Sequence, residues 1–324
     1  MTPDIYSGQI IKLGAPMIDL TNPIFHDADK AREYLEAQRW PDGPVCPHEG
    51  CEAKHQATKL EGKSTRPGLY KCKACEQPFT VTVGTVFEKS KIPLNKWLLA
   101  TFMMTGAKKG VSAHQVHRQL GVTYKTAWFM CQRVREAMTE DPRKSGPVGG
   151  GGKTVEADET FVGGKAKNAH KGKPIPPKRP VVALVERGGE VRVKHVADVT
   201  AKTVREVLVT QASRKSHLMT DYAAIYDAMG REFRSHDTVN HSAGEYVRGK
   251  AHTNTAESFF AIVKRQMYGT HHAVSEQHLQ RYVSEAAFKW NNRSAIGVED
   301  TERANNALKG IGGKRLTYRP VDPS

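Results

Sequence analysis

The sequence predicts an α/β protein, in which a mixed sheet flanked by helices follows a small cysteine-bearing module and a helical segment. Two observations carry this prediction. Residues 153–295 have the order strand, hairpin, helix, strand, strand and helix, which is typical of a mixed sheet covered by helices. Two pairs of cysteines precede that region among turn-forming residues, which suits a small module held together by a metal.

Changes in composition along the chain divide it into six parts. The hairpin of the sheet domain is expected to turn at Gly188 and Gly189, and a glycine-rich stretch is the clearest linker. The expected parts are an N-terminal helical segment (1–40), a cysteine-bearing ribbon (41–90), a helical pair (91–140), a linker (141–152), the sheet domain (153–295) and a basic tail (296–324).

The charge of the chain points to a polyanionic partner. Its 324 residues include 49 lysines and arginines against 34 aspartates and glutamates, a formal net charge of +15. Such an excess favours nucleic acid as the partner. The apolar run at 97–104 is too short to span a bilayer, and the N-terminus does not have the pattern of a signal peptide. We therefore expect no membrane association, a cytoplasmic location and reduced or metal-bound cysteines.

The cysteine spacing predicts a structural zinc site. Four residues separate the first pair, two separate the second, and twenty lie between the pairs. Four thiolates close a tetrahedral Zn²⁺ site and leave no position open for water. The expected ligands are Cys46, Cys51, Cys72 and Cys75. His48 and His55 are possible but unnecessary substitutes, and Cys131 is expected to be a core residue of a helix.

Residues 110–138 resemble a helix-turn-helix. Ser112 and Thr123 are suitable N-caps for two helices, and Gly121 lies in the turn between them. Any short helical hairpin gives the same pattern, so this interpretation also depends on the basic charge of the chain. The residues expected to face DNA on the second helix are Tyr124, Lys125, Gln132, Arg133 and Arg135.

The stretch VGGGGKT at 148–154 invites interpretation as a nucleotide-binding loop. A Walker A loop requires glycine at the position that Pro147 occupies, and it must open a helix. Residues 154–162 instead alternate with period two, which predicts a strand. The glycines are therefore interpreted as a flexible hinge before an acidic strand.

That strand places Glu156 and Asp158 on one face, where carboxylates are costly unless they are paired or bind a cation. Asp221 ends a later apolar strand, and Glu257 lies in the first turn of a helix with an apolar face. Three carboxylates on two strands and a helix can hold two Mg²⁺ ions for phosphoryl transfer. Glu156 and Glu159 flank Asp158 and are further candidates, although the motif begins at Asp158.

These residues resemble a known catalytic pattern. Between Asp158 and Asp221 lie 62 residues, and between Asp221 and Glu257 lie 35, which is similar to the Asp-Asp-(35)-Glu pattern of ribonuclease-H-like transposases and integrases. Together with the DETFVGGK block, the HTNTAESFFAIVKRQ block and the cysteine ribbon, the chain resembles ISXO-type insertion-sequence transposases, in the branch related to Merlin elements. The resemblance implies a ribonuclease-H-like sheet, catalytic Mg²⁺ ions on the three carboxylates, and a phosphate contact for Lys264.

The resemblance also implies that the partners are double-stranded DNA, namely terminal repeats and target, and a second copy of the chain or a larger homo-oligomer, working at the nucleoid. A basic run beside the acidic strand is well placed for the DNA backbone, although such a run is usually a solvated loop. Its expected contacts are Lys165, Lys167, Lys171 and Lys173. His241 and His252 bracket the loop before Glu257 and are interpreted as solvent-facing or phosphate-binding.

Two other functions fit parts of the sequence. One is a ribonuclease-H-like nuclease that cuts without joining, and the DNA-reading modules at 46–138 argue against it. The other is a zinc-ribbon and helix-turn-helix regulator whose sheet domain is inert, which would leave the three carboxylates unexplained.

Overall fold

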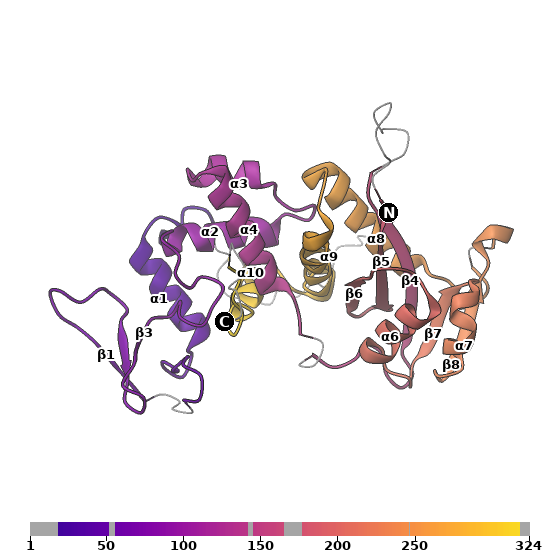
Figure 1. The fold of residues 1–324 in the computed structure, drawn as a ribbon, viewed down its shortest axis with the longest axis horizontal. Coiled ribbons are helices and arrows are strands. Elements are labelled where there is room, and N and C mark those ends of the chain that lie inside the picture. Colours follow the sequence, from indigo (N-terminus) through magenta and orange to yellow (C-terminus); the bar gives the residue numbers. More distant parts are fainter. Residues whose placement is uncertain (1–18, 52–55, 142–144, 165–176, 246, 318–324) are drawn as a thin grey trace, which may run out of the picture.

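The computed structural model describes residues 19–51, 56–141, 145–164, 177–245 and 247–317. The N-terminal modules and the sheet domain lie at opposite ends of an elongated molecule, and helices α4 and α9 lie between them (Figure 1). None of the helices in these ranges has the length and apolar character needed to cross a membrane.

The N-terminal end contains helix α1 (Ala28–Arg39), whose N-cap is Asp27. The Asp27 carboxylate accepts hydrogen bonds from the backbone N–H groups of Asp29 and Lys30 at 2.7 and 3.0 Å. The ribbon that follows is a small antiparallel sheet of β1 (Ala57–Lys59), β2 (Tyr70–Cys72) and β3 (Pro78–Phe79). Its short strands are packed against the ring of Trp40 at the end of α1.

Helices α2 (Leu94–Gly106), α3 (Ala113–Leu120) and α4 (Tyr124–Met138) form the helical module. The predicted caps are confirmed, since the Ser112 and Thr123 side chains accept hydrogen bonds from the backbone at the starts of α3 and α4. Gly121 ends α3 with φ 59°, a left-handed conformation that glycine adopts without strain. The helix-turn-helix geometry of this segment is thus locally encoded.

The described part of the expected basic tail, residues 296–317, contains a helix that packs on the N-terminal modules. Helix α10 (Asp300–Lys309) lies against α1, α2 and α4, which are far from it in the sequence (Figure 1). Leu308 and Ile311 are buried in the core of the helical module. Lys314 donates hydrogen bonds to the carbonyl groups of Glu136 and Ala137, 3.1 Å each, at the end of α4. The C-terminal segment therefore completes the N-terminal core.

The sheet domain contains five strands in the order β6-β5-β4-β7-β8. The central strand β4 pairs antiparallel with β5 and parallel with β7, which confirms a mixed sheet. The strands are β4 (Thr154–Val162), β5 (Arg179–Glu186), β6 (Val191–His195), β7 (His217–Asp221) and β8 (Ser235–Val239). The hairpin between β5 and β6 turns at Gly188, with φ 73°, as predicted.

Helices cover both faces of this sheet. On one face, α8 (Asn254–Gln266) and α9 (Glu276–Asn291) pack on Val181, Ala183 and Val185. On the other, α6 (Ala201–Gln211) and the short α7 (Asp227–Gly230) pack on Val155, Ala157 and neighbouring residues. The even-numbered residues of β4 consequently face α8 and the odd-numbered ones face α6 and α7.

The glycine run before β4 is docked on the sheet domain, in contrast to the expected flexible hinge. Gly149 donates a backbone hydrogen bond to Glu186 at 2.9 Å, and Gly150 donates one to the Ser216 hydroxyl at 2.8 Å. Gly149 has φ 90°, and a Cβ atom there would lie 2.1 Å from the Ser216 hydroxyl. Glycine is needed at this position because the backbone approaches the sheet closely. The glycines begin the sheet domain.

Candidate metal centres and nucleic-acid surface

The four predicted cysteines converge in the ribbon. Their sulfur atoms all lie within 4.8 Å of one another, with 3.7 Å between Cys46 and Cys75 and 3.7 Å between Cys51 and Cys72. A tetrahedron with Zn–S bonds of about 2.3 Å has edges of about 3.8 Å. The sulfur positions therefore fit one Zn²⁺ ion bound by four thiolates.

Helix α4 buries the fifth cysteine, Cys131, as expected, and it is far in sequence from the ribbon. His48 packs against the ring of Phe79 with its centroid at 6.3 Å, and His55 lies outside the described residues. The four-cysteine set needs neither histidine.

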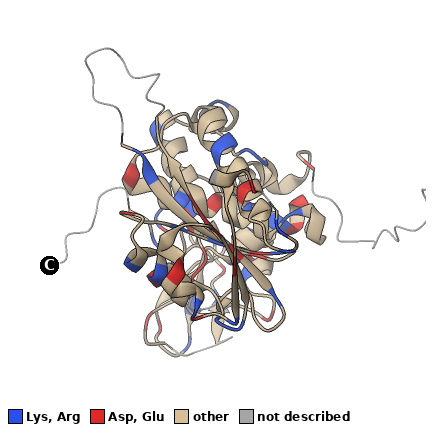
Figure 2. Cartoon of the chain, turned by 90° about the vertical axis from the view of Figure 1, so that its right-hand side faces the viewer, with Lys and Arg blue, Asp and Glu red and all other residues tan. Residues whose placement is uncertain are grey.

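Three elements bring the predicted acidic residues to one end of the sheet. The parallel register pairs Glu156 of β4 with Met219 of β7, and continuing it by two residues places Asp158 beside Asp221. Helix α8 packs on β4 and carries Glu257 in its first turn. Figure 2 shows acidic residues along the central strands, with basic residues on the surrounding helices and loops.

The electrostatics of this end show that the carboxylates are mutually close. Burial, and then the charges of Glu159, Asp221 and Glu257, raise the pKa of Asp158 to about 7. Burial also raises the pKa of Asp221, while His241 lowers it. The ionised form of Asp158 is thus disfavoured by its acidic neighbours, so a bound cation would stabilise it.

The donor set fits Mg²⁺, which prefers oxygen ligands. The Oδ1 atom of Asp221 is buried and has no hydrogen-bond partner among the described residues, although buried polar atoms are normally satisfied. The side chain of Glu257 is half exposed, and its Oε1 atom lies 3.4 Å from His241 Nε2. Among the described residues, the four cysteines are the group whose ligand atoms lie close enough together to hold a metal ion without rearrangement. Glu257 is the outer member of the cluster.

Glu156 and Glu159 have structural partners instead. Glu159 accepts a hydrogen bond at 2.6 Å from the hydroxyl of Tyr226, on the opposite face of the sheet from Asp158. Glu156 is fully buried, and its carboxylate receives Arg187 at 2.6 Å together with the backbone N–H groups of Thr255 and Ala256 at 2.7 and 3.0 Å. It therefore caps α8 from the neighbouring strand.

The histidines lie on either side of this helix start. His241 Nε2 is 3.1 Å from the Thr253 hydroxyl, and His252 Nδ1 is 3.2 Å from Glu156. Both are partly buried, so neither is simply solvent-facing. Lys264 is exposed on α8, seven residues after Glu257, and both lie on one side of the helix.

The DNA-facing residues expected on α4 divide into two groups. Tyr124 and Lys125 are exposed at the start of the helix, the end that a helix-turn-helix presents to DNA. Gln132 and Arg135 are buried, so the expectation that they face DNA is wrong. Arg133 turns inward, where it donates to the carbonyl groups of Glu88 and Leu316 at 3.2 and 3.3 Å.

The buried pair joins the helical module to the sheet domain. Gln132 donates to the hydroxyl of Tyr282 at 3.1 Å, and Arg135 Nε lies 2.7 Å from the carboxylate of Glu285 on α9. Lys289 lies 2.5 Å from the other oxygen of Glu285, so one buried carboxylate holds two cations. Polarity on α4 was a poor guide to exposure because α9 packs on this face.

The lysines of the basic run that follows β4 in the sequence lie outside the described residues. They are Lys165, Lys167, Lys171 and Lys173.

Comparisons with known proteins agree with this architecture. The ISXO2-like transposase domain matches residues 149–291, which begins at the docked glycines, and the transposase zinc-ribbon domain matches residues 26–77. A chain from Halobacterium salinarum, described as an uncharacterized protein in transposable element ISH50, is 30% identical over 274 residues. The alignment covers 78% of this chain and 87% of that relative.

The fold and the matched domains define a class, that of transposases with a zinc ribbon ahead of a ribonuclease-H-like sheet domain. Within that class, the chain belongs to the ISXO2-like family of insertion-sequence transposases.

Proposed function

We propose that the protein binds the terminal inverted repeats of an insertion sequence and catalyses Mg²⁺-dependent DNA cleavage and strand transfer. The observation that carries this proposal is the convergence of Asp158, Asp221 and Glu257 at one end of the sheet in a transposase-family chain. An inert sheet domain would have no use for an aspartate whose pKa is raised by burial and by its acidic neighbours.

Asp158, Asp221 and Glu257 are the residues that would hold two Mg²⁺ ions. When bound, such ions activate an attacking oxygen and stabilise a leaving one in phosphoryl transfer. Strands β4 and β7 fix the two aspartates on a rigid floor, and α8 supplies the glutamate. Lys264, exposed on the same helix, binds a substrate phosphate near the reacting bond.

The reaction has two displacements. In the first, water attacks a phosphodiester at the transposon end, and the broken P–O bond leaves a free 3′-OH. In the second, that 3′-OH attacks a phosphodiester of the target, forming one P–O bond and breaking another. Both attacking groups are DNA or water, so the proposal needs no serine or tyrosine nucleophile.

The DNA contacts begin in the N-terminal modules. Tyr124 and Lys125 at the exposed start of α4 contact the terminal repeat, and the zinc ribbon supports this module. The lysines of 165–173 contact the DNA backbone beside the catalytic centre. Because two transposon ends are processed together, the active form is a homodimer or larger assembly on DNA at the nucleoid.

A cleavage assay tests the catalytic assignment. Purified protein is incubated with a labelled duplex that carries the element end and Mg²⁺, alongside Asp221→Ala. The matched control is Asp237→Ala, which removes an exposed aspartate from the neighbouring strand β8. We expect cleavage by the wild type and the control, and a loss of at least about 100-fold in Asp221→Ala. Equal cleavage by the three proteins would exclude Asp221 from catalysis.

A further inference from the structure

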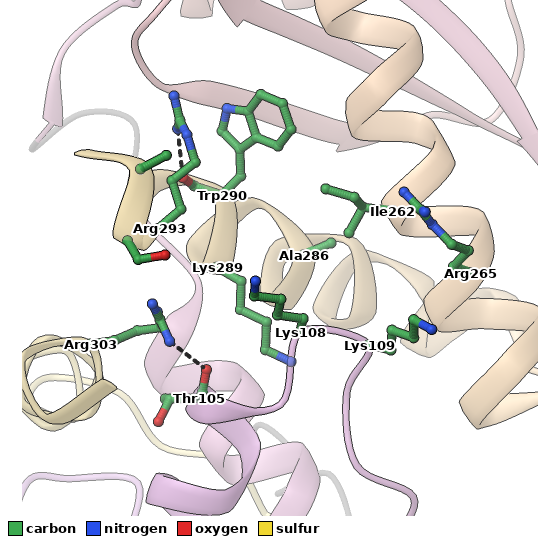
Figure 3. A pocket seen from close by; sticks show the side chains of 12 residues that line it. Thr105, Lys108, Lys109, Ile262, Arg265, Ala286, Lys289, Trp290, Arg293 and Arg303 are labelled. Atoms are coloured by element: carbon green, nitrogen blue, oxygen red, sulfur yellow. Dashed lines mark hydrogen bonds between the residues drawn. The ribbon is translucent and has the colours of Figure 1, made fainter. Parts of the chain in front are cut away.

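A basic pocket lies between the helical module and the sheet domain, on a different side of α8 from Glu257 and Lys264. It has a volume of about 370 Å³. Ile262 and Arg265 of α8, Lys108 and Lys109 after α2, and Trp290 of α9 all line it (Figure 3).

The pocket has an excess of positive charge. Among the described residues that line it, six are basic and none is acidic. Two of the six already have carboxylate partners, because Lys289 is paired with Glu285 and Arg303 with Asp300. The four that have no carboxylate partner among the described residues are Lys108, Lys109, Arg265 and Arg293. Such a set attracts a phosphate group.

The wall of the pocket is apolar and aromatic. Ile262, Ala286 and Trp290 contribute to it, and Arg293 lies over the Trp290 ring at 4.8 Å from the centroid. The pocket thus combines an apolar surface for a base or sugar with cations for a phosphate.

The pocket is held in shape from both sides. The hydroxyl of Thr270, after α8, donates to the backbone carbonyl of Lys109 at 2.8 Å. Arg303 donates to the carbonyl groups of Asn292 at 2.6 Å and Val298 at 3.0 Å. Ligand binding therefore would not carry the entropic cost of ordering the basic loop after α2.

We propose that this pocket binds one unpaired nucleotide of the DNA substrate, a step that rests on the proposed function. The volume is in the range of small-ligand pockets, about 300–1,000 Å³. Stacked duplex bases would leave the apolar wall unused, whereas an unpaired base contacts it. Glu257 and Arg265 are separated by about 12 Å along α8, at about 1.5 Å per residue. The bound nucleotide lies a few positions from the cleaved phosphodiester.

Oligonucleotide binding tests the pocket. The probes are the single strand (dT)12, a 12-base-pair duplex and a 12-unit abasic strand, which keeps the phosphates but lacks the bases. The variants are Lys108→Ala, Arg265→Ala and Trp290→Leu, with Trp290→Phe to preserve ring packing against Phe259. The matched charge control is Lys202→Ala, at an exposed position on α6, which packs on the opposite face of the sheet from α8.

We expect Lys108→Ala and Arg265→Ala each to weaken (dT)12 binding several-fold and to reduce its salt dependence, while Lys202→Ala does neither. Trp290→Leu should weaken (dT)12 binding about tenfold or more, leave abasic-strand binding unchanged, and exceed the effect of Trp290→Phe. Equal losses on Trp290→Leu for (dT)12 and the duplex, or for (dT)12 and the abasic strand, would overturn the assignment to an unpaired nucleotide.

Strand transfer by the same proteins separates the two proposals. If the wild type joins DNA but the pocket variants bind all probes normally, the pocket assignment fails alone. If the pocket variants lose (dT)12 binding as expected and the wild type neither cleaves nor joins its element end, the proposed function fails alone.

Discussion

The carboxylate of Glu156 on β4 caps helix α8 through Thr255, which donates its backbone N–H at 2.7 Å and its hydroxyl at 2.9 Å. The residue at the usual capping position, Thr253, makes no side-chain capping hydrogen bond. Free N–H groups at a helix start need an acceptor, and a negative charge there is favourable. Glu156 therefore fixes the turn of α8 that carries Glu257 against the strand that carries Asp158.

Glu156→Gln tests this positioning role. The variant keeps an acceptor for α8 but removes the charge paired with Arg187 at 2.6 Å. Breaking a buried ion pair costs roughly 3–5 kcal/mol, so the melting temperature should fall. At a temperature where the variant is still folded, we expect weaker activation by Mg²⁺ with unchanged DNA affinity. Glu206→Gln, at an exposed position on α6, is the control. Unchanged Mg²⁺ dependence would limit Glu156 to a role in stability.

Metal content tests the ribbon. The wild type should carry one zinc per chain, and Cys72→Ser should lose it, because the site needs all four thiolates at close to tetrahedral distances. Atomic absorption measures the metal after dialysis. Cys131→Ser is the matched control, since Cys131 is buried in α4. Equal zinc in Cys72→Ser and the wild type would be inconsistent with the four-cysteine site.

Comparing Arg135→Ala with Lys125→Ala tests whether Arg135 is an internal residue and Lys125 a DNA-binding one. Arg135→Ala leaves the fully buried Glu285 with one cation fewer, which should destabilise the protein by roughly 3–5 kcal/mol. Lys125→Ala, at an exposed position on α4, should instead weaken DNA binding with little change in melting temperature. Thermal melting and DNA titration of both variants measure these effects. Weaker DNA binding by Arg135→Ala without a fall in melting temperature would indicate that Arg135 binds DNA.

The same interface predicts loss of stability in acid. Burial lowers the pKa of His271 to about 4, and nearby Arg135 contributes to the shift. Burial alone would raise the pKa of Glu285, but Lys289 and Arg135 outweigh it and lower this pKa to about 2. Both groups bind protons more readily when unfolded, so stability should fall as the pH drops.

The two groups reduce the stability over different ranges of pH. Protonation of His271 reduces it between pH 6.5, its ordinary pKa, and about pH 4, and protonation of Glu285 reduces it between pH 4.5 and about pH 2. Melting temperatures of the wild type and His271→Phe between pH 7 and pH 4 measure the first window. The wild type should lose more stability across it than the variant. Parallel pH curves would show that His271 is not responsible.

Local features of the fold were predictable from the sequence, and long-range ones were not. Asp27, Ser112 and Thr123 cap helices through residues two or three positions away, so the sequence shows their role directly. The burial of Arg135 depends on Glu285, which lies 150 residues further along. Helix α10 was missed because few of its residues are strongly apolar, although Leu308 is fully buried.

The candidate site shows the same division. Period two on β4 predicted that Glu156 and Asp158 share a face, and the family spacing selected Asp158, Asp221 and Glu257. The capping of α8 by Glu156 joins residues 99 and 100 positions apart, which no local pattern indicates. The basic pocket draws its residues from α2, α8, α9, α10 and the segments that follow α2 and α9, so only the folded chain brings them together.

Joining of a pre-cut transposon end to a target plasmid tests the central claim most directly, because it isolates strand transfer from hydrolysis. A labelled duplex with a free 3′-OH at the element end is incubated with protein, plasmid and Mg²⁺. We predict joined products from the wild type and Asp237→Ala, and none from Asp221→Ala or Glu257→Gln. Hydrolysis of the plasmid without joining would indicate a nuclease, and tight binding of the end without either reaction would contradict the catalytic assignment.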